Sequence, residues 1–258
     1  MTINLQNISI SLNNKIVLED INLNVNSGEV LSLIGPNGAG KSSLINVISG
    51  DYLPTKGEVI YDGINIKEFT LEEKSRKRSV MSQFSNIAFD YKVKDIIEFG
   101  WVENSIEIFS NMFDEIVLKI SKLCDVIDLL NRNINTLSGG EIKRVQLAKT
   151  LLQLYNPSQK NHNKYAFMDE PLSNLDLFYE IKVLKIIQSI AKSQGIGILL
   201  VIHDLNLATK FSDKIALMDK GKLISYGAPE KVMKPKILKS IYKLDIKIQK
   251  KPFWINYF

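Results

Sequence analysis

The stretch VLSLIGPNGAGKSSLINVISG (30–50) decides the fold of this chain. Its middle, GPNGAGKS (35–42), matches the pattern G-x-x-x-x-G-K-[ST] and lies between an apolar, strand-like run and a segment with helical spacing. Its glycines let the backbone curl so that successive N–H groups face one anion. Lys41 would bring a charge to the β- and γ-phosphates of a nucleotide, and the Ser42 hydroxyl would bind Mg²⁺. A glycine turn without a ligand is the alternative, but the strand–loop–helix context favours a phosphate-binding loop.

Length and composition are those of an ordinary globular protein. The chain has 258 residues, of which 45% are hydrophobic and 24% are charged. This length suits one large α/β domain or two smaller ones. The longest apolar run, IGILLVI (196–202), is too short to cross a bilayer and suits a buried strand.

The compartment is indicated by the N-terminus and by the single cysteine. MTINLQNISISL lacks the basic-then-apolar layout of a signal peptide. Cys124 is the only cysteine, which excludes an internal disulfide framework and fits a reducing compartment. Because Cys124 lies in an apolar helical pattern, we expect it to be buried and inert. We therefore expect a cytosolic location.

Secondary-structure signals change along the chain. Short β-like runs broken by Asn-Asn, Ser-Gly and Asp-Gly turn signals come first, namely ISISL, IVLEDINLNV, EVLSLIG and EVIYDGINI (58–66). Between about 93 and 131, apolar residues recur at helical spacing, which predicts amphipathic helix. These residues are Phe109, Met112, Phe113, Ile116, Ile120, Leu123 and Ile127. After a polar loop, QLYNPSQKNHNK (153–164), strands and helices alternate, which predicts a parallel sheet.

The positive charge is mild. A formal net charge of +5 suits polyphosphate ligands, an anionic membrane surface or nucleic acid. Its densest cluster is KSRKR (74–78), just before the apolar SVMSQF. No aromatic platform accompanies this cluster, so we interpret it as a solvated helix end before a strand and expect no nucleic-acid partner.

Two carboxylates follow the apolar run of YAFMDE (165–170). Asp169 and Glu170 would stand at the carboxyl end of a buried strand, where α/β proteins bind their ligands. Asp169 could then hold the Mg²⁺ shell, and Glu170 could polarise a water for in-line attack. His203 follows the next apolar run and should end its strand at the same edge, near the γ-phosphate. Two solvated carboxylates and a capping histidine are the structural alternatives.

The pentapeptide LSGGE (137–141) carries no evident catalyst. The sequence after it has helical spacing, so Ser-Gly-Gly would form a bare helix N-terminus with free N–H groups, which binds anions. An ordinary serine cap explains the same residues equally well.

These motifs together resemble those of ATP-binding cassette (ABC) ATPases. GPNGAGKS, Gln83 after an apolar run, LSGGE, AFMDE, SNLD (173–176) and His203 follow one another in the order and approximate spacing of that family, over nearly the whole chain. LSGGE separates this family from other P-loop proteins. The resemblance implies that the pentapeptide closes over ATP held by a second subunit.

The resemblance also implies an architecture. It predicts an α/β fold with a P-loop NTPase (RecA-like) core, an antiparallel β subdomain and an inserted α-helical subdomain. Residues 1–258 would form a single ABC ATPase domain. Its nucleotide-binding core would cover about 1–84 and 156–258, and the helical subdomain, with the signature loop, about 85–155.

Residue roles follow from the same resemblance. The expected ATP-binding residues are Gly35, Pro36, Asn37, Gly38, Ala39, Gly40, Lys41, Ser42 and Ser43. The expected contacts to a second subunit's ATP are Ser138, Gly139, Gly140 and Glu141. The cofactors would be ATP and Mg²⁺, the metal being bound by Ser42 and Gln83 and, through water, by Asp169. Glu170, His203 and Gln83 would serve catalysis, and Asp176 would lie at the dimer interface.

The chain departs from the family's pattern in places. Leu12 stands near the position at which many members stack adenine on an aromatic ring, so the base would be held more weakly or by other groups. Leu172 replaces a common threonine and Asn174 a common alanine, and neither change removes a catalytic group.

Three classes of function compete. A transporter ATPase fits best, because a nucleic-acid clamp of this family usually carries two cassettes or a long coiled coil, and a P-loop kinase would not need LSGGE. The segments VIHDLNLATKFSDKIALMDKGKLISYGAPEKVM and QLAKTLLQLYNPSQKNHNKYAFMDEPLSNLDLF resemble importers of haem, ferric siderophores and vitamin B12, and the second is most similar to the haem importers.

The importer resemblance implies a set of partners. We expect a homodimer of this subunit, two copies of a separate transmembrane permease and, indirectly, an extracytoplasmic substrate-binding protein. The chain would be peripheral, on the cytoplasmic face of the inner membrane. His162, in the polar loop, is expected to be solvated and not a haem ligand.

Overall fold

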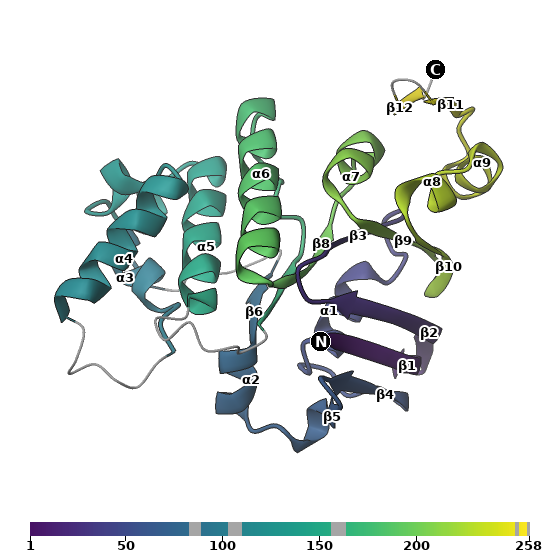
Figure 1. Ribbon diagram of the computed structural model, residues 1–258, viewed down its shortest axis with the longest axis horizontal. Helices are drawn as coiled ribbons and strands as arrows, with labels where there is room; N and C mark the ends of the chain where they lie inside the picture. The colour runs from purple at the N-terminus through teal and green to yellow at the C-terminus, as the bar shows by residue number, and fades with distance from the viewer. Residues whose placement is uncertain (83–88, 103–109, 156–163, 251–252, 257–258) are drawn as a thin grey trace.

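Two sheets and the helices packed around them organise the chain (Figure 1). The computed structural model describes residues 1–82, 89–102, 110–155, 164–250 and 253–256, with the backbone alone at 110, 111, 249, 250, 253, 254 and 256. Gln83 and His162 lie outside the described residues, so the roles given to them above stay predictions.

An antiparallel sheet is formed by residues near the N-terminus, where the sequence predicted short strands and the family resemblance implied an antiparallel subdomain. In spatial order its strands are β2 (Lys15–Asn26), β1 (Thr2–Leu12), β4 (Lys56–Tyr61) and β5 (Ile64–Asn65). Asn13 and Asn14 join β1 to β2 with positive φ angles of 50° and 62°, which asparagine tolerates better than most residues. Asp62 and Gly63 make the corresponding turn between β4 and β5.

The second sheet is six-stranded and mostly parallel, which confirms the prediction from strand–helix alternation. In spatial order its strands are β10 (Lys222–Gly227), β9 (Lys214–Asp219), β3 (Val30–Ile34), β8 (Gly197–Val201), β7 (Tyr165–Met168) and β6 (Arg78–Met81). Within this sheet, as far as the structure describes its strands, only the pairing of β10 with β9 is antiparallel. A short hairpin, β11 (Lys247–Lys250) and β12 (Phe253–Asn256), forms a separate two-stranded sheet near the C-terminus (Figure 1), and its Ile255 is buried in the core.

The helices lie on different sides of these sheets. Their bounds are α1 (Lys41–Ile48), α2 (Leu71–Lys77), α3 (Val93–Glu98), α4 (Ser110–Leu123), α5 (Gly139–Leu154), α6 (Leu177–Gln194), α7 (Leu205–Phe211), α8 (Pro229–Val232) and α9 (Pro235–Tyr242). Figure 1 shows α3, α4 and α5 grouped beside α6, on the side of the molecule away from the antiparallel sheet. Among the described residues, no helix is both long enough and apolar enough to cross a membrane.

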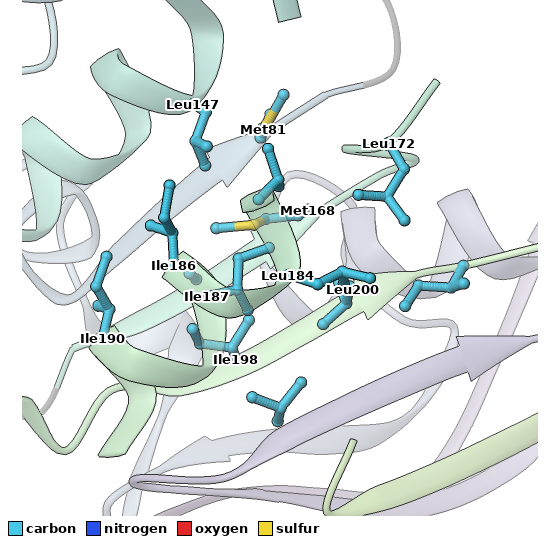
Figure 2. Packing of buried hydrophobic residues seen from close by; sticks show 14 of the residues in the cluster. Met81, Leu147, Met168, Leu172, Leu184, Ile186, Ile187, Ile190, Ile198 and Leu200 are labelled. Atoms are coloured by element: carbon cyan, nitrogen blue, oxygen red, sulfur yellow. The ribbon is translucent and has the colours of Figure 1, made fainter. Parts of the chain in front are cut away.

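Two cores form because successive residues of a strand point to opposite faces of the sheet. On β7, Ala166 and Met168 enter the core shared with the helices, while Tyr165 and Phe167 enter the core shared with the antiparallel sheet. The strand is fully buried, as the apolar run YAFM predicted. Figure 2 shows the first core, where side chains of α6 pack over Met168 and the alternate β8 residues Ile198 and Leu200.

Helix α4 ends earlier than the apolar pattern predicted. Its last residue is Leu123, and Asp125, with a positive φ of 53°, interrupts the helical path. Ile127 begins a separate 3₁₀ turn and is 40% exposed, so the prediction that helix continues to Ile127 is wrong. Ile116 and Ile120, in the same pattern, are buried as expected.

The basic cluster at 74–78 ends α2 and begins β6, which confirms the prediction of a helix end before a strand. Arg76 pairs with Glu72 at 2.8 Å, and Arg78 pairs with Asp51 at 3.0 Å. These ion pairs give the cluster a structural role within the chain.

Cys124 should react slowly with thiol reagents in the folded protein. Its side chain is buried, and burial raises the pKa of its thiol to about 12, so the reactive thiolate is scarce at pH 8. We expect labelling by an aromatic disulfide at pH 8 to be about 10³-fold slower than in guanidinium, where the pKa returns to about 8.5. Absorbance of the released thiol measures both rates, and equal rates in the two conditions would contradict the buried placement.

Candidate functional site

Three neighbouring parallel strands deliver the predicted site residues to one edge of the sheet. The P-loop follows β3, Asp169 and Glu170 follow β7, and His203 follows β8, which lies between the other two. Since the carboxyl ends of parallel strands meet at one edge, these segments converge. The prediction that His203 ends its strand is wrong, because β8 stops at Val201 and the histidine lies in the bend before α7.

The P-loop glycines are required by two different constraints. Gly40 caps α1 with a left-handed φ of 97°, which only glycine adopts at little cost. Gly35 has φ 147°, and a Cβ built there would stand 2.2 Å from the carbonyl oxygen of Met218 on β9. Gly38 has open space around it, so its φ of 78° alone favours glycine.

Lys41 lies folded over the loop that precedes it. Its side chain is buried, and Nζ donates hydrogen bonds to the Gly35 carbonyl at 2.8 Å and the Pro36 carbonyl at 3.0 Å. Burial lowers the pKa of this ammonium, whereas the Glu170 and Asp169 carboxylates raise it. The loop carbonyls thus hold a buried cation beside the strand-end carboxylates.

A cavity of about 680 Å³ joins the P-loop to the carboxylate edge. The residues that line it are Val17, Asn37, Gly38, Gly40, Lys41, Ser42, Ser43, Glu170 and His203. Its volume lies in the range of small-molecule sites. Of the predicted ATP-binding residues that do not line it, Pro36 accepts a hydrogen bond from Lys41, and Ala39 is buried beneath the loop.

Glu170 and His203 meet across this cavity. His203 Nε2–H donates to Glu170 Oε1 at 2.7 Å, and both side chains retain exposure to solvent. Glu170 has a positive φ of 52°, which is uncommon for a residue with a Cβ and is most often retained at functional sites. The histidine can therefore orient a carboxylate that stands at the open end of the P-loop.

Asp169 is more enclosed than its neighbour. It is 6% exposed, and its Oδ1 atom is buried without a hydrogen-bond partner among the described residues. The pKa of this carboxyl is raised, chiefly by burial and also by the neighbouring Glu170 carboxylate, although a hydrogen bond with the Ser42 side chain and the Lys41 and Lys143 ammonium groups oppose the rise.

These features suit Mg²⁺. An orphaned carboxylate oxygen beside a serine hydroxyl is a donor set that magnesium accepts, since this metal keeps several waters and binds nucleotide phosphates. No group of three or more histidine, cysteine or acidic side chains among the described residues could hold a metal by itself. A magnesium site here would therefore depend on phosphate and water ligands as well.

The signature loop at 137–141 leads into α5, and the structure supports the interpretation of Ser138 as a helix cap. Ser138 is the N-cap, with Oγ accepting from the Glu141 N–H at 3.3 Å and its own N–H donating to Glu141 Oε2 at 2.7 Å. This capping box means that the expectation of a bare N-terminus is wrong in this conformation. Ser138 and Gly139 are nevertheless exposed to solvent and are not among the cavity-lining residues.

The loop before α6 packs directly on the signature loop. A Cβ added to Gly140 would stand 2.9 Å from the Asn174 carbonyl oxygen, and one added to Gly139 would stand 3.3 Å from the Asn174 Cβ. Asn174 has a positive φ of 63°, which explains an asparagine there. Asp176 is exposed and caps α6, its Oδ1 accepting from the Tyr179 N–H at 3.0 Å.

Sequence reasoning missed two residues near the site. Val17, on β2, lines the cavity beside the P-loop, but its apolar strand pattern carried no sign of this. Lys143, on α5, is 5% exposed and lies close enough to Asp169 and Glu170 for their charges to affect its pKa. A lysine inside an amphipathic helix gives no signal in the sequence that it is buried.

The fold and the cavity define the class: an α/β protein with a P-loop NTPase core, which confirms the predicted fold class. The chain belongs to the ABC transporter family, whose model matches residues 18–173.

Relatives with curated names are similar over nearly the whole chain. A "Hemin import ATP-binding protein HmuV" of Escherichia coli O157:H7 is 34% identical and covers 97% of this chain and 95% of the relative. A protein of the same name from Hahella chejuensis (strain KCTC 2396) is 33% identical, and the match covers 95% of this chain and 94% of the relative.

Solved structures share the fold at lower identity. A nucleotide-free ATP-binding cassette from an ABC transporter has a TM-score of 0.77 at 24% identity, covering 94% of this chain and 99% of that one. A dimeric cassette bound to ADP and Pi, in a post-hydrolysis state, has a TM-score of 0.75 at 24% identity. The match covers 88% of this chain and 98% of that one.

Proposed function

We propose that this chain is the ATP-hydrolysing subunit of an ABC importer that takes up haem, with ATP and Mg²⁺ as cofactors. ATP hydrolysis is supported by one observation: the P-loop, Glu170 and His203 line the same cavity. The cargo is supported by the relatives, which are named as hemin import proteins.

The hydrolytic step would use charges already placed in the cavity. The P-loop N–H groups and Lys41 bind the phosphates, and Lys41 exchanges its carbonyl partners for phosphate oxygens. Glu170 takes the proton of a water aimed at the γ-phosphorus, and the hydrogen bond from His203 keeps that carboxylate in line. Ser42 and Asp169 would hold Mg²⁺, which neutralises the charge that develops on the phosphates.

A second copy of the chain would complete the site. Ser138 and Gly139 are exposed at the start of α5, outside the lining of their own chain's cavity, so they are available to a nucleotide held by another copy. A two-fold dimer lets each signature loop close over the other chain's ATP. In that dimer Glu141 and Asp176 would exchange their capping roles for contacts across the interface.

The permease would dock beside β6 and α3. A small cavity of about 150 Å³ lies there, lined by Val80, Met81, Ser82, Tyr91, Ile96, Phe99, Gln146, Lys149 and Thr150. Phe99 is 55% exposed and its ring packs edge-on against Tyr91 at 5.2 Å. Exposed aromatic side chains around a hollow suit a helix from a protein partner. Docking there would place the chain on the cytoplasmic face of the membrane.

Haem should stimulate the assembled transporter without touching this chain. A loaded permease favours cassette closure, because a ligand shifts an equilibrium only through its different affinity for the two states. We expect ATPase activity of the permease complex to rise at least about fivefold when haem and its binding protein are added. Phosphate release measures this rise.

The matched control is His162→Ala. We expect this variant to keep the full response, since a histidine in a hydrophilic loop lacks the apolar walls of a haem pocket. Stimulation by a ferric siderophore or vitamin B12 system with none by haem would refute the cargo. A His162→Ala complex that hydrolyses ATP normally yet ignores haem would refute the indirect role.

A further inference from the structure

The C-terminal hairpin is attached to α7 through the side chain of Asn206. The Oδ1 atom of Asn206 accepts a hydrogen bond from the Ile255 N–H at 2.8 Å, and its Nδ2 donates to the Ile255 carbonyl at 3.3 Å. The amide thus pairs with both backbone groups of one residue on β12, as a neighbouring strand would. Asn206 is half-buried, which limits competition from water and strengthens both bonds.

The side chain of Ile255 anchors the hairpin to the body of the protein. It is fully buried in the core that the helices share with the parallel sheet. Ile248, its partner across the hairpin on β11, packs against the same core. Burial of these apolar side chains therefore fixes the hairpin, and the amide pair of Asn206 fixes α7 to the hairpin.

Helix α7 begins beside the histidine of the site. Asp204 directly follows His203 and caps the helix with its side chain. The far end of α7 is attached to α6, because Gln188 Nε2 donates to the Phe211 carbonyl at 3.1 Å. Asn206 lies in the first turn, so its contact with the hairpin fixes the end of α7 that follows His203.

The direction of the His203 ring depends on where that end of α7 lies. Residues 202–204 form neither helix nor strand, so no regular backbone ladder holds them. His203 Nε2–H donates to Glu170 Oε1 at 2.7 Å, and both residues line the nucleotide cavity. Since a hydrogen bond weakens steeply when donor and acceptor are misaligned, a small movement of α7 would weaken this one.

We propose that Asn206 is a positioning residue for His203, and that the C-terminal hairpin, through Asn206 and α7, keeps the imidazole aligned with Glu170. No described residue of the hairpin lines the nucleotide cavity, so the effect of the hairpin on hydrolysis passes through α7. This inference rests on the proposed ATPase function.

The first test is kinetic and compares Asn206→Ala with Thr209→Ala in the full-length, untagged protein. Alanine at position 206 removes both bonds to Ile255, so we expect kcat to fall about tenfold while the KM for ATP stays within about twofold. Ile255→Ala loosens the hairpin from the core and should lower kcat in the same way. Thr209→Ala is the control, because it removes a hydrogen bond within α7, to the Leu205 carbonyl, and should keep kcat within about twofold of wild type.

The second test observes His203 directly and does not depend on hydrolysis. The chain has two histidines, so in a His162→Ala background with ¹³C-labelled histidine the imidazole NMR signals come from His203 alone. Glu170→Ala in this background gives the position of the Cε1–H signal without the carboxylate bond. Asn206→Ala should move the signal toward that position, and Thr209→Ala should leave it unchanged.

The two measurements together separate positioning from a purely structural role. An Asn206→Ala protein in which kcat or the His203 signal stays at its wild-type value would overturn the inference. A thermal melt shows whether each variant is folded, and Ile255→Ala is judged by the same two measurements if Asn206→Ala does not fold. If wild type and Glu170→Gln hydrolyse ATP equally, the proposed function fails, while the His203 signal still shows whether Asn206 orients the imidazole.

Discussion

A Glu170→Gln protein should bind Mg-ATP, hydrolyse it about 10²–10⁴-fold more slowly than wild type, and accumulate as a closed dimer. Glutamine keeps the shape of the side chain and can still meet His203 Nε2, which lies 2.7 Å from the present carboxylate. It cannot take the proton of the attacking water. ATP would therefore persist between a P-loop and a partner's signature loop.

Light scattering with and without Mg-ATP measures the dimer, and phosphate release measures hydrolysis. Glu230→Gln is the matched control, because this glutamate is exposed on α8 and is not among the cavity-lining residues. It should hydrolyse ATP like wild type and leave no stable dimer. A Glu170→Gln protein that stays monomeric under saturating ATP would refute the shared site.

Lys41→Ala should lose nucleotide binding, with affinity lower by about 10²-fold or more. Lys41 is the buried cation of the P-loop; it lines the cavity, and its Nζ donates hydrogen bonds to two carbonyls of that loop. Alanine removes both the charge and the donors. A fluorescent ATP analogue measures the affinity, and a thermal melt confirms that the variant is folded.

Ser138→Arg serves as the counterpart of that variant. Ser138 is exposed and outside the lining of its own chain's cavity, so the arginine should spare nucleotide binding. Its bulk should block closure over a partner's ATP, and light scattering should then find no ATP-dependent dimer. The opposite pattern, with binding lost in Ser138→Arg and kept in Lys41→Ala, would refute these roles.

Motifs and local patterns in the sequence were enough to predict most of the fold. The glycine-dependent curl of the P-loop, the buried strand YAFM and the Asn-Asn and Asp-Gly turns depend on residues close together in the chain, and the structure confirms each of them. The predicted C-terminal end of helix α4 was wrong. Nothing in the apolar spacing revealed that Asp125 would take a positive φ and stop it.

The sequence predicted that the site residues lie at one edge of the sheet, but it did not predict the contacts between them. Strand order in a parallel sheet brings Glu170 and His203 to one edge, but the 2.7 Å hydrogen bond between them depends on the bend after β8. The capping box at Ser138 was one of two open interpretations, since the sequence permits both a cap and an anion site.

What the sequence determined by itself was therefore local: the P-loop backbone, the alternation of the strands, and the family to which the chain belongs. The tertiary structure decided which residues far apart in the sequence come into contact. Gly35 must be glycine because β9 passes over it at Met218, and Lys143 is buried because α5 packs against β6 and β7. The reason is physical: backbone preferences act between neighbours, whereas burial and charge interactions act between residues that only folding brings together.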